Sequence, residues 1–146
     1  MAINFFEDFE ISTIKIKNGS LRLRKAGHGP ALLMLHGNPQ THVMWHKVAP
    51  ALIKNFTIIC PDIPGYGKSY KPKISIDHNN YSKVSMADDI NELMTVLGYK
   101  TFYLVGHDRG ARIGHRLALN YPEKVIKIIL LDIIPTIEHF ERINKE

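Results

Sequence analysis

Four short, almost continuous apolar segments divide this chain, and they constrain its fold more than any other feature. They are ALLML at 31–35, FTIIC at 56–60, TFYLV at 101–105 and VIKIILL at 125–131. Segments of this length that are apolar on both faces are typical of strands in a parallel sheet whose faces are covered by helices. Alternating polar and apolar residues at 10–17 and 20–25, on either side of Asn18-Gly19, predict a β-hairpin at the edge of this sheet.

Helices are expected between the parallel strands, at 44–53, 81–97 and 109–120. The second has Ser82 or Ser85 as a possible cap and ends at Gly98. A hairpin followed by alternating strands and crossover helices predicts an α/β fold. Hydrophobic residues make up 45% of the chain and charged residues 23%, which is typical of one globular domain.

Composition also narrows the classes of function. No apolar segment approaches the roughly 18 residues of a membrane span, and the N-terminus has no signal-peptide pattern, so we expect a cytoplasmic protein that binds no membrane. The net charge of +5 is spread along the chain, which argues against nucleic acid as a partner. The single cysteine, Cys60, excludes an internal disulfide. His42 and His46 are interpreted as packing or solvent-facing residues, and we expect no metal and no cofactor.

The segment GHDRG at 106–110 follows the third apolar run, at the edge of a parallel sheet where active sites form. It has the form of a nucleophile elbow, with Asp108 at the position of the usual serine. A carboxylate is ionised at neutral pH, so it attacks a saturated carbon without a base and forms an alkyl ester. A base is needed only afterwards, to activate water. The alternative interpretation is that Asp108 caps the following helix.

Arg109 and Arg112 lie three residues apart at the start of the expected helix, so their side chains share one face. Cations in a first helical turn oppose the positive end of the helix dipole, which suggests a functional reason for their presence. Two guanidinium groups beside the nucleophile form a bidentate clamp for a substrate carboxylate. The alternative is that both are solvated surface residues.

Two further strand ends are expected beside Asp108. Asp132 follows the fourth apolar run and is interpreted as the acid that orients a catalytic histidine, with a turn residue as the alternative. After the first run, a backbone N–H near Asn38 and that of Arg109 are expected to form an oxyanion hole. His36 is expected to hold this loop, and the segment from Asp62 to Gly67 to carry a structural carboxylate.

Four segments resemble the α/β-hydrolase superfamily, in the branch of fluoroacetate (haloacetate) dehalogenases and epoxide hydrolases. They are HGNPQTHVMW, PDIPGYGKS, GHDRGARIGHRLALNYPEKV and LLDIIPT. The resemblance implies that Asp108 is the nucleophile, that Arg109 and Arg112 bind a substrate carboxylate, and that Asp132 is the acid of the triad. The implied reaction is hydrolytic dehalogenation of small 2-haloacids such as haloacetate through an alkyl-enzyme ester.

At two positions, the residue in this chain differs from the one that is usual in a particular subfamily. Asn38 stands where haloacetate dehalogenases have Phe, and it is similar to the Asn that helps hold the halide in haloalkane dehalogenases. Arg109 stands where haloalkane dehalogenases and epoxide hydrolases usually have Trp. The choice of a short carboxylate as substrate therefore depends on the arginines, and epoxide hydrolysis stays the alternative activity.

The length of the chain raises a further expectation. Members of this family continue into a helical cap and place the catalytic histidine after the last strand. Residues 1–136 are therefore expected to be the N-terminal part of an α/β-hydrolase core and 137–146 the start of a cap, with the rest of the cap and the C-terminal strands missing. His107 and His115 are expected to point away from the nucleophile. His139 follows Asp132 by seven residues, which are too few for the chain to return to the nucleophile.

An incomplete triad leaves the enzymatic status open. The chain is either an incomplete dehalogenase-like hydrolase or a catalytically inert or split fragment that needs a C-terminal half. The apolar segment 125–131 is expected to form an exposed sheet edge, which favours a complementary half or a homodimer as partner and makes the isolated chain marginally stable.

Overall fold

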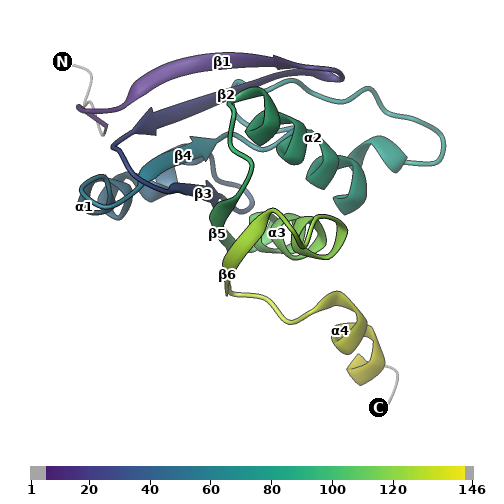
Figure 1. Ribbon diagram of the computed structural model, residues 1–146. Coiled ribbons are helices and arrows are strands. Elements are labelled where there is room, and N and C mark those ends of the chain that lie inside the picture. Colours follow the sequence, from purple (N-terminus) through teal and green to yellow (C-terminus); the bar gives the residue numbers. More distant parts are fainter. Residues whose placement is uncertain (1–5, 144–146) are drawn as a thin grey trace.

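The computed structural model describes residues 6–143 and contains a mixed six-stranded sheet in the order β1-β2-β4-β3-β5-β6 (Figure 1). The strands are β1 (Glu10–Ile16), β2 (Gly19–Ala26), β3 (Ala31–Leu35), β4 (Thr57–Pro61), β5 (Phe102–His107) and β6 (Val125–Leu131). The longer helices are α2 (Lys83–Val96), α3 (Arg109–Asn120) and α4 (Thr136–Ile143), and the short ones are η1 (His42–Lys47), α1 (Ala49–Leu52) and η2 (Asn79–Tyr81). The strands β4, β3, β5 and β6 are parallel, and β2 joins β4 antiparallel. The expected α/β fold is confirmed.

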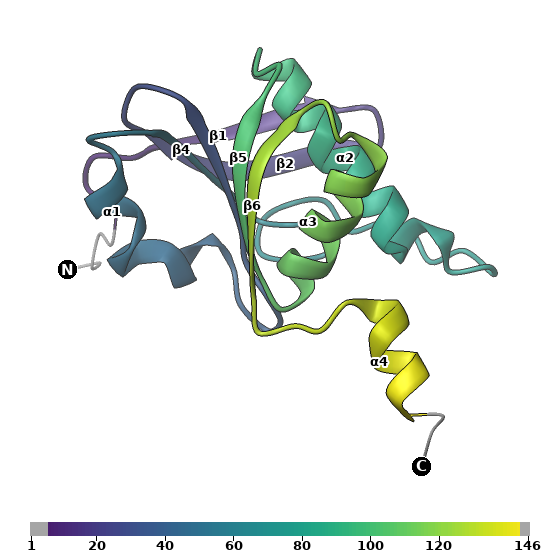
Figure 2. The ribbon, with the colours of Figure 1, turned by 60° about the horizontal axis from the view of Figure 1, so that its bottom comes forward.

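Helices cover both faces of the sheet. The side chains of β3 show this directly, because Leu33 and Leu35 pack in a cluster with residues of α2 and α3. Their neighbours Leu32 and Met34 pack in a second cluster with Trp45 of η1. Figure 2 shows α1 on one side of the strands and α2 and α3 on the other. Burial of β3 on both faces explains why the segment is continuously apolar.

The N-terminal hairpin forms, but its turn is one residue earlier than expected. Ile16 pairs with Gly19, so Lys17 and Asn18 make the turn and Gly19 is the first residue of β2. A Cβ on Gly19 would lie 2.3 Å from the ring of Tyr70. The glycine is therefore needed for a close approach rather than for the turn.

The predicted helix at 44–53 is wrong as one element. Its place is taken by the 3-10 helix η1 and the single turn α1. Pro50 explains the break, because its ring would clash with the carbonyl of His46 in a continuous α-helix. The helix predicted at 81–97 begins later, at Lys83, where the Ser82 side chain accepts a hydrogen bond from Ser85 N at 3.1 Å. The helix at 109–120 is confirmed.

The carboxyl ends of the parallel strands bring the polar segments together. Leu35 of β3 lies beside Gly106 of β5, and His107 of β5 lies beside Leu131 of β6. Asp108 and Asp132, which follow these positions, are therefore neighbours at one edge of the sheet, as predicted. Because β4 and β5 flank β3 on opposite sides, the site forms at the switch point of the topology.

Apolar side chains remain exposed at the C-terminal end of the described chain. Within residues 6–143, β6 pairs only with β5, and Ile126, Ile129 and Leu131 are 47%, 55% and 40% exposed. The helix α4 stands away from the sheet (Figures 1 and 2). The expected exposed edge is confirmed for the part that the structure describes. None of the helices within these residues has the length and apolar character needed to cross a membrane.

Candidate active site

The turn between β5 and α3 holds Asp108 in a backbone conformation that few residues adopt. Its φ is +47° and its ψ is −115°, and its side chain makes no hydrogen bond typical of an N-cap. Asp108 N donates to Leu131 O at 3.1 Å. A Cβ on Gly110 would lie 2.4 Å from the carbonyl oxygens of Leu35 and His36, so this turn packs directly on the end of β3. The elbow geometry is present, and the capping interpretation is wrong.

The Asp108 carboxylate receives backbone hydrogen bonds from two loops. Asn38 N donates to its Oδ2 at 2.8 Å, and the backbone N–H of Arg109 also stabilises the carboxylate. Burial opposes ionisation, but these hydrogen bonds and the charges of His107 and Arg109 outweigh it and lower the pKa of Asp108 below its ordinary value. The two backbone groups expected in the oxyanion hole therefore converge on the carboxylate.

The loop after β3 is fixed by buried contacts. His36 is fully buried, donates from Nδ1 to Gly37 O at 2.8 Å and accepts from Ile63 N at Nε2 at 3.0 Å. Burial is the main reason that the pKa of His36 is lowered. The Tyr66 hydroxyl donates to Asn38 Oδ1 at 2.9 Å. The expectation that His36 holds this loop is confirmed, whereas Tyr66 had no signal in the sequence.

The two arginines lie in the first turn of α3, directly after Asp108, and differ in exposure. Arg109 is exposed and Arg112 is half-buried. Arg112 also lines a cavity of about 440 Å³ together with Asp132, Ile133 and Ile134. The positive charge of Arg109 contributes to lowering the pKa of Asp108. The site therefore has cations next to an ionised carboxylate. Cations of this kind favour the binding of an anion.

Asp132 lies beside His107, which was expected to point away from the nucleophile. His107 Nε2 is 3.6 Å from Asp132 Oδ2, and the Asp132 backbone has φ +60°. A Cβ on Gly37 would lie 2.7 Å from His107 Nδ1 and 2.8 Å from Asp108 Cβ, so both side chains border Gly37. Alternation along an extended strand predicts opposite directions, but the left-handed backbone of Asp108 interrupts it. The side chain of His139 lies outside the described residues.

A lysine that the sequence analysis missed belongs to the same charged region. Lys83 begins α2 and is half-buried. Burial and then the charges of Arg109 and Arg112 lower the pKa of its ammonium group, while the charge of Asp108 opposes the shift. No local pattern links Lys83 to the elbow, because the packing of α2 against α3 brings them together.

Asp62, His42 and His46 have structural roles at this edge of the sheet. Asp62 is 1% exposed, and its Oδ1 accepts from His42 N and His42 Nδ1 at 2.9 and 2.7 Å. Its Oδ2 accepts from Lys68 N at 3.0 Å. Burial alone would raise the pKa of Asp62, but these hydrogen bonds lower it to about 2. His46 bonds through Nδ1 to Val43 O. Both histidines are thus packing residues.

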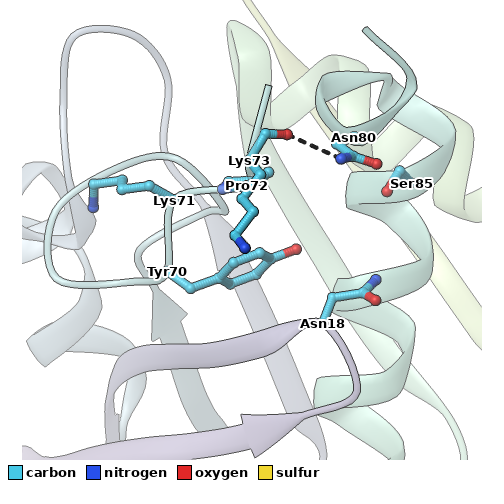
Figure 3. A pocket seen from close by; sticks show the side chains of 7 residues that line it. All are labelled: Asn18, Tyr70, Lys71, Pro72, Lys73, Asn80 and Ser85. Atoms are coloured by element: carbon cyan, nitrogen blue, oxygen red, sulfur yellow. Dashed lines mark hydrogen bonds between the residues drawn. The ribbon is translucent and has the colours of Figure 1, made fainter. Parts of the chain in front are cut away.

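A separate cavity of about 460 Å³ lies between the hairpin turn and the start of α2 (Figure 3). Tyr70 and Asn18 in its wall both donate to the buried Asp89, and Asn80 Nδ2 donates to Lys73 O at 2.9 Å. Among its described lining residues there is no predicted site residue. The hydrogen bonds give this wall a structural role in joining the hairpin to α2.

Known proteins resemble the chain over most of its length. It is 48% identical over 140 residues to a fluoroacetate dehalogenase from Burkholderia sp., which covers 96% of this chain and 46% of that protein. It is 40% identical over 110 residues to a soluble epoxide hydrolase from Corynebacterium sp. (strain C12), which covers 75% of this chain and 37% of that protein. The chain thus spans about half of the dehalogenase and over a third of the epoxide hydrolase.

Solved structures agree with these similarities. A crystal structure of a protein from Nostoc sp. PCC 7120, described as an α/β hydrolase, superposes with a TM-score of 0.91 at 53% identity and covers 93% of this chain and 47% of that chain. The family model of the α/β-hydrolase fold matches residues 30–145, which include every predicted site residue. The chain belongs to the α/β-hydrolase fold family.

Proposed function

We propose that this chain performs the alkylation step of hydrolytic dehalogenation on small 2-haloacids such as haloacetate. The observation that carries the proposal is the Asp108 carboxylate, which lies in an elbow of positive φ and has a lowered pKa, directly before the helical turn that carries Arg109 and Arg112. The 48% identical dehalogenase supports the same chemistry. We propose that the two arginines bind the carboxylate of the substrate and orient its α-carbon toward Asp108.

The first step needs no proton transfer. A carboxylate oxygen of Asp108 forms a bond to the α-carbon, and the bond from that carbon to the halogen breaks as the halide leaves with the electron pair. The product is an ester between Asp108 and the substrate. The hydrogen bond from Asn38 N to Oδ2 keeps the carboxylate oriented for this attack.

The second step is hydrolysis of that ester. Water attacks the ester carbonyl, the backbone N–H groups of Asn38 and Arg109 stabilise the oxyanion, and a histidine oriented by Asp132 accepts the proton of the water. The bond from the carbonyl carbon to the alkoxy oxygen then breaks. The 2-hydroxyacid leaves with the proton that the histidine returns, and the Asp108 carboxyl group is regenerated. We propose that this histidine comes from a complementary C-terminal half or a second chain, because the relatives are about twice as long. The ester on Asp108 is therefore expected to accumulate in the isolated chain.

The test is the intact mass of the folded chain after incubation with chloroacetate, together with the amount of chloride released. We expect one adduct and one chloride for each chain. Asp108→Asn is expected to abolish both, whereas the matched control Asp8→Asn, at an exposed position, is expected to leave them unchanged. Circular dichroism verifies that each variant is folded. Absence of an adduct in the folded chain contradicts the proposal and favours an inert fragment.

Epoxide hydrolysis is the second candidate, because a soluble epoxide hydrolase is also similar. An epoxide is neutral, so it gains nothing from the arginines. Incubation with styrene oxide is expected to leave Asp108 unmodified, and acetate is expected to compete with chloroacetate. An Asp108 adduct from styrene oxide that acetate does not block favours the epoxide hydrolase.

A further inference from the structure

The charged region around Asp108 contains a third cation, Lys83, whose position is determined by the fold. Ser82 caps α2 and places Lys83 in the first turn of that helix. Because α2 packs against α3 (Figure 2), this turn lies beside α3, and Lys83 shares a cavity lining with Arg112. The charges of both arginines and of Asp108 act on the Lys83 ammonium group.

Lys83 and Arg112 both line a cavity of about 540 Å³, together with His115, Arg116 and Glu138. Arg112 also lines the cavity that Asp132 lines. Within residues 6–143, the two ion pairs that form are His42–Asp62 and His107–Asp132, and neither includes Lys83. Burial of the Lys83 ammonium group disfavours its charged form, and the charges of Arg109 and Arg112 add to this, so a further anion bound nearby stabilises the charged group.

We propose that Lys83 is a substrate-binding residue that donates a hydrogen bond to the substrate carboxylate and makes the site selective for anionic electrophiles. This inference rests on the proposed function. When Asp108 attacks a haloacid, two carboxylates approach each other and repel. A third cation at the cavity wall offsets this repulsion and holds the substrate carboxylate away from the nucleophile. A neutral electrophile has no carboxylate, so its reaction does not depend on Lys83.

The test compares chloroacetate with its neutral analogue chloroacetamide as alkylating agents of Asp108. The full chain is used as the wild type, as Lys83→Met, as Lys83→Arg and as the control Lys54→Met, which removes an exposed lysine. Loss of a charged hydrogen bond predicts that Lys83→Met lowers the chloroacetate rate at subsaturating concentration by about tenfold or more. The loss is expected as a higher half-saturating concentration. The chloroacetamide rate is expected to be unchanged, and Lys83→Arg is expected to restore most of the chloroacetate rate.

Two results overturn the inference. Equal losses with both reagents mean that Lys83 only maintains the structure, and no loss with either means that Lys83 does not contact the substrate. Calorimetric titration with acetate separates this inference from the proposed function. If no Asp108 adduct forms in any chain, weaker acetate binding by Lys83→Met still supports the anion site, whereas unchanged binding overturns it.

Discussion

Two aspartates at the same edge of the sheet show how different environments divide structural from reactive carboxylates. Asp62 follows β4 and Asp108 follows β5, and these strands flank β3 on its two sides. Both have a pKa below the ordinary value. Asp62 is buried and accepts hydrogen bonds at both oxygens, from His42 and from Lys68. Asp108 is only partly buried, and its elbow backbone has a positive φ.

This difference shows that a low pKa by itself does not identify a nucleophile. The hydrogen bonds that lower the pKa of Asp62 also occupy its lone pairs and seal it inside the protein. The cations and backbone groups near Asp108 favour the ionised carboxylate while leaving access for a substrate. The comparison predicts that changes at Asp62 affect stability, whereas changes around Asp108 affect reactivity.

The largest expected effect on stability comes from Asp62→Ala. It leaves His42 and the Lys68 backbone N–H without their buried partner, so the free energy of unfolding is expected to fall by about 3 kcal/mol. Asp108→Ala is expected to change it by less than about 1 kcal/mol, because that side chain is partly exposed. Urea unfolding measures both values. Similar losses in the two variants contradict the division of roles.

Gly37→Ala is expected to reduce reactivity while leaving most of the fold intact. The new Cβ would lie 2.8 Å from Asp108 Cβ and 3.0 Å from Asp108 Oδ2, so the carboxylate must move. Displacement of a reacting group by about 1 Å predicts a rate of Asp108 alkylation by chloroacetate about 100-fold lower. In the control Gly114→Ala, the new Cβ meets the side chain of Leu104, away from the carboxylate. If Gly114→Ala lowers the alkylation rate as much as Gly37→Ala does, the effect of Gly37→Ala is not a local effect on the carboxylate.

Ionisation of Asp62 also makes the stability of the folded chain depend on pH. The pKa of Asp62 is about 2 in the folded chain, below its ordinary value of 3.8. The stabilisation from Asp62 is therefore fully present above about pH 4 and is lost as the pH falls through about 2. The advantage of the wild type over Asp62→Asn is expected to shrink by about 2 kcal/mol between about pH 5 and pH 2. Denaturant unfolding of both chains at each pH measures this advantage. An advantage that is the same at pH 5 and at pH 2 contradicts the prediction.

The sequence predicted the parts of the molecule that depend on local pattern. Runs that are apolar on both faces, such as 31–35, identify strands covered on both sides, and the glycines around Asp108 identify the elbow. The parallel pairing of β5 with β6 then brings Asp132 beside Asp108. These predictions succeeded because strand periodicity and chain order determine which residues reach the same edge of the sheet.

The parts that were missed depend on contacts between distant segments. Lys83 joins the charged region through the packing of α2 on α3, and Tyr66 reaches Asn38 from another loop. The His107 prediction was wrong because the backbone reverses its regular alternation at Asp108. The helix predicted at 44–53 is wrong as one element because Pro50 interrupts it.

The most direct test of Asp108 as the nucleophile is to locate the adduct by tandem mass spectrometry of peptides from chloroacetate-treated chain. A carboxymethyl group is expected on Asp108 as a base-labile ester, with Asp62 unmodified. Burial raises the pKa of the Cys60 thiol far above its ordinary value, so this residue is also expected to stay unmodified. An adduct confined to Cys60 or a histidine, with Asp108 intact in the folded chain, contradicts the account.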